Sequence, residues 1–159
     1  MGAEELWSGG VRGLGNRAQG RDARTPELAC AAFAAALGSA DPGAAAACFV
    51  PDGCLIAPDA TSVHGRADIC LVLIQLVALQ TRVEVESIAV FEGAELALAL
   101  QRWKITVQAP DGSRDVQLTD PTLVLRRIES EWKLAIAAPW GTGEGRGTKR
   151  SSRGSRSRP

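Results

Sequence analysis

The sequence of 159 residues has no tyrosine and a single histidine, His64. Its four cysteines, Cys30, Cys48, Cys54 and Cys70, include no Cys-x-x-Cys pair. Structural zinc sites need cysteine and histidine ligands in such closely spaced pairs. We therefore predict no metal site, and we interpret the cysteines as small apolar core residues of a protein in a reducing compartment.

Long apolar runs are also absent. Residues 69 to 79 form the most apolar stretch, which Gln75 interrupts, and this stretch is roughly half of the ~20 residues needed to cross a bilayer. The beginning of the chain has no positively charged segment followed by an apolar one, so no secretory signal is predicted. We expect no membrane segment and a cytoplasmic location.

The formal net charge of zero conceals an uneven distribution of charge. Residues 26 to 140 carry 8 Lys and Arg against 14 Asp and Glu, whereas residues 141 to 159 carry six against one. We predict a disordered leader at 1–24, one domain at 25–141 and a disordered basic tail at 142–159. Such a tail attracts nucleic acid by counterion release. It has no aromatic residue to stack on bases, however, so a nucleic acid partner is not expected.

The first third of the domain contains two sequence signals for the start of a helix. Thr25-Pro26-Glu27 supplies an N-cap hydroxyl, a proline at the first helical position and a carboxylate at the positive end of the helix dipole, and this helix ends at Gly38. Asp41-Pro42 repeats the signal for a short second helix that closes at Cys48-Phe49.

A turn at Asp52-Gly53 is predicted to lead into a strand at residues 54–57, which Pro58 stops. His64 then lies in a loop before a third helix, which starts after Gly65. Apolar residues occupy most of both sides of that helix, so we expect it to be buried on more than one face.

The second half of the chain alternates with a period of two and predicts antiparallel strands. The pattern slips near Ser87-Ile88, as a bulge would make it. The predicted strands begin at Arg82 and then span 95–107, 115–128 and 131–138, with turns at 93–94, 110–113 and 129–130. Three helices followed by an antiparallel meander make the fold class α+β.

The order of these motifs resembles a known family. The run from Phe33 through Asp41-Pro42-Gly43 and Pro51-Asp52-Gly53 to Gly65 is similar to the opening of the nuclear transport factor 2-like superfamily, which includes ketosteroid isomerase and the SnoaL-type polyketide cyclases. Trp132 to Ile136 followed by Pro139-Trp140-Gly141 resembles the last strand of SnoaL-like domains. The resemblance implies three helices on a strongly curved antiparallel sheet, a cone-shaped cavity that needs no cofactor, and homodimers formed through the sheet.

The working groups of the best-known enzymes are missing. Aligning the isomerase pattern puts Phe33 at the position of its tyrosine and Ala57 at that of its base, while its strand acid falls near Thr122 or Leu123. Limonene epoxide hydrolase, another relative, carries an Arg-x-Asp piece, and the nearest match here is Arg102-Trp103-Lys104. Neither mechanism is therefore expected in its known form.

Two residues are the candidates for catalysis. Asp120 points the same way as Val116 and Leu118 if strand alternation holds, and a carboxylate on an apolar side would have a raised pKa and act as a base. Pro121 resets the alternation in the other interpretation, which leaves Asp120 solvated. His64 is either a proton carrier or a hydrogen-bonded loop residue.

Four further residues are candidates for ligand binding. Asp59 either lines the cavity mouth, pairs with His64, or forms a turn after Pro58. Trp103 belongs to a cavity wall or to a dimer face, Phe33 to an apolar wall or the core, and Trp140 to a lid or to plain packing.

Two functions follow from these candidates. The first is a SnoaL-like domain that binds a small apolar molecule, as an isomerase, cyclase or hydratase. The second is a non-catalytic dimeric module of the same fold that binds a ligand or a protein. Solvent-facing positions for both Asp120 and His64 would favour the second.

Overall fold

A computed structural model describes residues 23–78 and 82–141. Its elements are α2 (Pro26–Gly38), α3 (Pro42–Ala47), β1 (Phe49–Ile56), β2 (Ser62–His64), α4 (Arg66–Val77), β3 (Arg82–Glu92), β4 (Leu96–Gln108), β5 (Arg114–Thr119), β6 (Thr122–Ile128) and β7 (Glu131–Ala138). The predicted tail and almost all of the predicted leader lie outside the described residues. Within the described ranges no helix is long and apolar enough to cross a membrane.

Both predicted helix starts are confirmed. The Thr25 hydroxyl accepts a hydrogen bond from the backbone N–H of Leu28 at 3.2 Å, and Oδ1 of Asp41 accepts one from the N–H of Ala44 at 2.9 Å. Each cap satisfies a backbone donor that the first helical turn leaves unpaired. The caps therefore fix where α2 and α3 begin.

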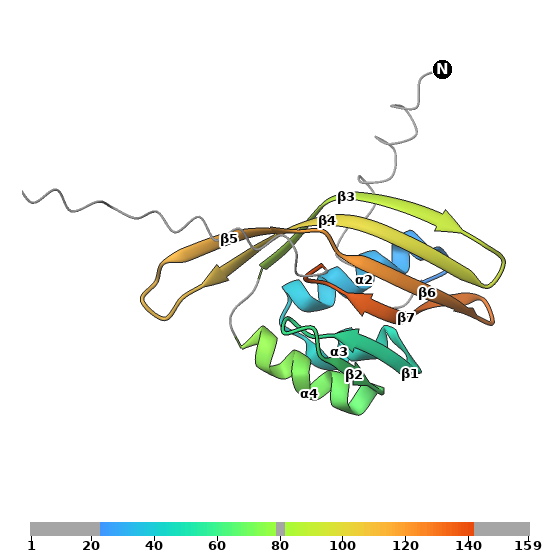
Figure 1. The fold of residues 1–159 in the computed structure, drawn as a ribbon, viewed down its shortest axis with the longest axis horizontal. Helices are drawn as coiled ribbons and strands as arrows, with labels where there is room; N and C mark the ends of the chain where they lie inside the picture. Colours follow the sequence, from blue (N-terminus) through green and yellow to red (C-terminus); the bar gives the residue numbers. More distant parts are fainter. Residues whose placement is uncertain (1–22, 79–81, 142–159) are drawn as a thin grey trace, which may run out of the picture.

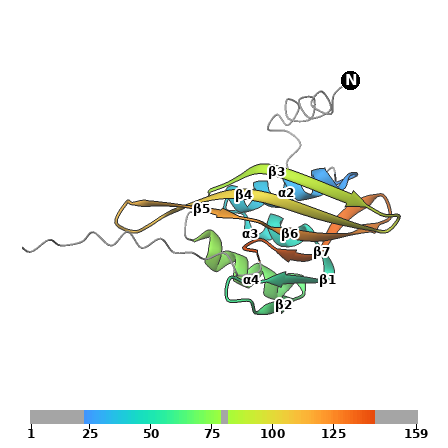
Figure 2. The ribbon, with the colours of Figure 1, turned by 45° about the horizontal axis from the view of Figure 1, so that its top comes forward.

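The sheet runs in the order β2-β1-β7-β6-β4-β3, with β5 paired to β4. It curls over α2 and α3, and α4 lies beside β1 and β2 away from β3 (Figures 1 and 2). The fold is α+β, as predicted. The strand pairs are antiparallel, as predicted, with the one exception of β1 and β7, which pair in parallel.

The first strand differs most from its prediction. Asp52-Gly53 is not a turn but lies inside β1, and the pairing of β1 with β7 shifts register between Phe49 and Cys54. A bulge absorbs these residues without ending the strand. His64, predicted in a loop, lies in β2, where it pairs with Cys54.

The predicted strand 115–128 is two strands. β5 pairs with residues 103–108 of β4, and β6 pairs with residues 96–100 of the same strand. Proline at position 121 has no backbone N–H to donate to a neighbouring strand, and the strand is interrupted there. The carbonyl of Pro121 still accepts a hydrogen bond from the N–H of Gln101 at 3.0 Å. The bulge predicted near Ser87 is confirmed between Val85 and Ser87.

Helix α4 is buried on one face only, which corrects the prediction. Ile69 and Leu73 are fully buried, whereas Leu71 is 62% and Ile74 is 48% exposed. The sheet and α3 cover one side of α4, and the other side faces outward in the single chain. The core itself lies between α2 and the concave side of the sheet, where Phe33 packs edge-on to Phe49 with ring centroids 5.5 Å apart.

Candidate functional site

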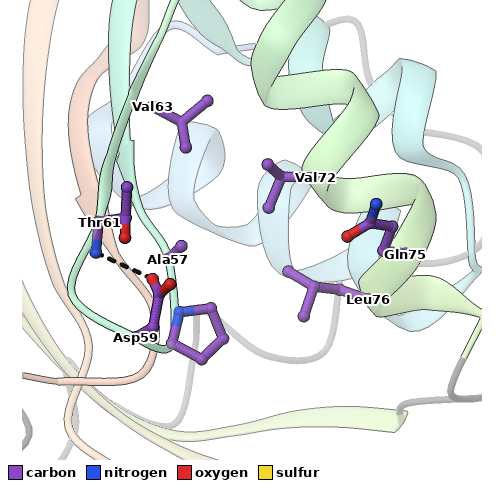
Figure 3. A pocket seen from close by; sticks show the side chains of 8 residues that line it. Ala57, Asp59, Thr61, Val63, Val72, Gln75 and Leu76 are labelled. Atoms are coloured by element: carbon purple, nitrogen blue, oxygen red, sulfur yellow. Dashed lines mark hydrogen bonds between the residues drawn. The ribbon is translucent and has the colours of Figure 1, made fainter.

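An open pocket of about 430 Å³ lies between α4 and the turn that joins β1 to β2. This volume is within the range of small-molecule sites. Figure 3 draws the side chains that form it. The pocket is lined by Ala57, Pro58, Asp59, Thr61, Val63, Val72, Gln75 and Leu76.

A tight turn builds one wall. The N–H of Ala57 donates to the carbonyl of Thr61 and the N–H of Ala60 donates to the carbonyl of Ala57, both at 2.9 Å. Ala60 adopts a positive φ of 67°. Oδ1 of Asp59 accepts a hydrogen bond from the N–H of Thr61 at 3.0 Å (Figure 3). The predicted turn-forming role of Asp59 therefore coexists with a place in the pocket wall.

The hydrogen bonds of Thr61 to the Asp59 carboxylate lower the pKa of Asp59 below its ordinary value, because they favour the charged form. The carboxylate is thus ionised at neutral pH. Asp59 is the one charged residue among the eight that line the pocket. A carboxylate whose pKa is not raised accepts a proton poorly at neutral pH, so Asp59 is suited to binding more than to proton transfer.

Helix α4 supplies the opposite wall. Gln75 and Leu76 lie three and four residues after Val72, a spacing that places each of them on the same helix face as Val72. Val72 and Leu76 are half-buried, and Gln75 adds a carboxamide that both donates and accepts hydrogen bonds. The pocket is therefore apolar in its middle, with polar groups from both walls.

Ala57 lines this pocket. It occupies the position that the isomerase resemblance gives to the catalytic base, and its methyl group cannot take a proton. The carboxylate of Asp59, two residues along the chain, is the acidic group of the wall.

Asp120 lies away from the pocket. The alternation with Val116 and Leu118 holds, but all three side chains are exposed on the side of the sheet opposite the helices. The side chain of Asp120 is 71% exposed, and its Oδ1 lies 3.0 Å from Nε of Arg102. The structure supports the solvated interpretation of Asp120, because the side of the sheet that Asp120 shares with Val116 and Leu118 is the outer one.

His64 also faces away from the pocket. Its neighbour Val63 lines the pocket, and successive side chains of a strand point to opposite faces. Nε2 of His64 lies 4.0 Å from Sγ of Cys54 on the paired strand. No contact brings His64 together with Asp59, so the predicted pairing of those two residues is not found among the described residues.

The aromatic candidates belong to the core. The rings of Phe33 and Trp103 are 6.1 Å apart, and both side chains are fully buried. Trp140 is half-buried and packs against the same core. None of the three lines the pocket.

Sequence analysis assigned no role to two residues whose polar side-chain atoms are buried. Gln101 is only 5% exposed, its Oε1 accepts a hydrogen bond from the indole N–H of Trp103, and its Nε2 has no partner. Oγ1 of Thr119, which is opposite Trp103, has none either. Gln101 was detectable as the one polar residue in the alternating apolar positions from 97 to 105.

The thiol of Cys30 lies near Gln101. Burial raises the pKa of Cys30 to about 12, and the nearby side chain of Gln101 opposes this rise. Burial also raises the pKa of Cys48, to about 11. Among the described residues, no three acidic, histidine or cysteine side chains gather as metal ligands would.

No model of a known protein family matches the sequence, and no curated protein matches it either. Solved structures do. A protein of Novosphingobium aromaticivorans with an NTF2-like, cystatin-like fold is 17% identical, with a TM-score of 0.64 over 74% of this chain and 79% of that one. A cystatin-like protein of Caulobacter vibrioides is 22% identical, with a TM-score of 0.63 over 75% and 87%.

A ketosteroid isomerase-like protein of Erwinia carotovora atroseptica is 20% identical and superposes with a TM-score of 0.63 over 74% of this chain and 94% of that one. At these identities the superpositions show a shared architecture of helices and curled sheet. They do not show a shared activity, which must be argued from the site. The chain has the fold of the nuclear transport factor 2-like superfamily.

Proposed function

We propose that this chain is a ligand-binding domain that takes a compact, largely apolar molecule into the pocket between α4 and the β1–β2 turn. The observation that carries the proposal is the pocket itself, whose middle is formed by Val63, Val72 and Leu76 and whose edges carry Asp59 and Gln75. Apolar walls with a few placed polar groups are typical of small-molecule sites.

Binding without catalysis is the function that the site supports better. A reaction of the isomerase, cyclase or hydratase kind needs a group that moves a proton, and such a group must reach the substrate. Asp120 and His64 both face solvent away from the pocket. Asp59 lines it but is a weak base, because its pKa is lowered.

Filling the pocket tests the proposal. Val72→Trp would place an indole in the pocket, while Leu71→Trp puts the same group on the exposed side of α4. A library of small apolar compounds is screened by ligand-observed NMR against the unsubstituted protein and both variants. Hits that Val72→Trp loses and Leu71→Trp keeps support the site. Hits kept by both variants would locate binding elsewhere, and an empty screen would count against the function.

We propose further that the domain forms a homodimer through the outer face of the sheet, the side opposite the helices. Register places Phe91 beside Leu98, Leu98 beside Val124 and Val124 beside Ile136 on this face. Its exposed apolar side chains are Phe91, Leu96, Leu98, Leu100, Val116, Leu118 and Ile136. An exposed apolar surface that spans several strands is typical of an interface between proteins.

Sedimentation equilibrium tests the dimer. Leu100 on the outer face and Ile74 on α4 have similar exposure, 43% and 48%, and both are changed to Arg. Leu100→Arg should shift the protein to monomer while Ile74→Arg leaves it dimeric. Dissociation by Ile74→Arg alone would assign the interface to α4.

A cytoplasmic location, finally, agrees with the four cysteines, all of which are free thiols.

A further inference from the structure

The walls of the pocket carry charge of one sign only. Of the eight residues that line it, Asp59 is charged and none is lysine, arginine or histidine. No ion pair joins Asp59 to a cation in the part of the chain that the structure describes. A ligand that enters this pocket therefore meets a carboxylate that no positive side chain of the wall neutralises.

The carboxylate is held in place. Its Oδ1 accepts the hydrogen bond from the N–H of Thr61 at 3.0 Å, within the turn that also fixes Ala57 and Ala60. Figure 3 shows the other oxygen of Asp59 turned towards α4, with Leu76 and Gln75 on the opposite wall of the pocket. A donor on the ligand can reach this oxygen while the Thr61 hydrogen bond stays intact.

We propose that the pocket selects compact apolar molecules that carry a primary ammonium group, with the ammonium against Asp59 and the apolar part against Val63, Val72 and Leu76. This inference rests on the proposed binding function and adds the ligand class. An ammonium adds its own positive charge to the hydrogen bonds that it donates to a carboxylate, a hydroxyl donates a hydrogen bond without such a charge, and a ligand carboxylate is repelled by the like charge. The carboxamide of Gln75 supplies a further acceptor.

The test is a matched set of three probes at neutral pH: 2-phenylethylamine, 2-phenylethanol and 3-phenylpropanoate. Their affinities for the full chain are measured by NMR titration of backbone amides. The expected order is amine, alcohol, carboxylate, with roughly three- to tenfold between amine and alcohol, because Asp59 is open to water and its ion pair is screened.

Asp59→Asn removes the charge and keeps an oxygen that accepts from Thr61. This variant should lose the preference for the amine, so that its affinities for the amine and for the alcohol become similar. Asp111→Asn is the control, because Oδ1 of Asp111 accepts from the N–H of Ser113 at 2.9 Å in the same kind of turn, outside the pocket. It should leave all three affinities unchanged.

The outcomes separate the two proposals. Equal binding of the three probes, or a preference for the carboxylate, would overturn the ammonium selectivity and leave the pocket as a ligand site. No binding of any probe, together with an empty screen, would overturn both. The probe order in the unsubstituted protein decides the matter even if Asp59→Asn fails to fold.

Discussion

Nε of Arg102 lies 3.0 Å from Oδ1 of Asp120, and this pair joins β4 to the residue after β5 on the outer face of the sheet. The Asp120 carboxylate raises the pKa of Arg102 by hydrogen bonding and by its charge. Both side chains are more than half exposed, and ion pairs at such positions are worth little. The pair therefore marks Asp120 as a surface residue of the proposed dimer face.

Asp120→Asn should change the free energy of unfolding by less than about 0.5 kcal/mol and leave ligand affinity unchanged, because it weakens one exposed ion pair. Urea unfolding and NMR titration measure the two quantities. A loss of ligand binding, or of turnover if a substrate is found, would return Asp120 to the site.

Thr119→Val should raise the free energy of unfolding, by up to about 1 kcal/mol, because it replaces a buried hydroxyl that has no hydrogen-bond partner by a methyl group of similar shape. Urea unfolding at neutral pH measures the change. The control is Thr122→Val on β6, where the effect should be smaller because Oγ1 of Thr122 is not a buried atom without a hydrogen-bond partner. Destabilisation by Thr119→Val would mean that the hydroxyl has a partner, such as a buried water or a ligand group.

Alkaline pH should destabilise the protein through Cys30. The unfolded chain releases the thiol proton near the ordinary pKa of 9.0, whereas burial in the folded state raises this pKa to about 12. The unfolded state then binds fewer protons, so the free energy of unfolding falls as pH rises from about 9 towards 12. For one thiol the slope approaches roughly 1.4 kcal/mol per pH unit.

Urea unfolding of the unsubstituted protein and of Cys30→Ala, at several alkaline pH values, isolates this effect. The variant starts from a lower stability because it loses the packing of a buried sulfur atom, but its stability should fall less steeply with pH. Parallel pH dependences in the two proteins would contradict the assignment to Cys30.

The helix caps and the alternation of β4 were predictable because they are local. Thr25 and Asp41 act on backbone groups within three residues, and the buried side of β4 follows directly from its period of two. The parallel pairing of β1 with β7 was not predictable in this way, because these strands are far apart in the sequence and no turn joins them.

The site was only partly predictable for a related reason. Asp59 was a candidate because it lies five residues before His64, near the expected mouth of the cavity, and it does line the pocket. Val72, Gln75 and Leu76 look in the sequence like part of a helix buried on several faces, and only the position of α4 beside the β1–β2 turn makes them a pocket wall. The position of Asp120 outside the pocket was not predictable, because alternation tells which residues share a face and not which face is inside.

Gly53 is the residue on which the bulge in β1 depends. A Cβ atom added there would lie 2.9 Å from Cδ1 of Phe49 and 3.0 Å from the carbonyl oxygen of Val50. Phe49 is fully buried and packs edge-on against Phe33, so its ring cannot move aside freely. Gly53→Ala should therefore lower the free energy of unfolding by about 1–3 kcal/mol.

Gly43→Ala is the matched control. A Cβ atom at Gly43 would lie 3.6 Å from Oδ1 of Asp41, an ordinary contact, and alanine favours the helix in which Gly43 lies. It should raise the free energy of unfolding by up to about 1 kcal/mol. Opposite signs in urea unfolding would confirm that steric contact with Phe49, and not the general effect of replacing glycine, requires glycine at position 53. A neutral or stabilising effect of Gly53→Ala would contradict this requirement. It would mean that β1 relaxes at its bulge, or that the ring of Phe49 moves aside despite its packing against Phe33.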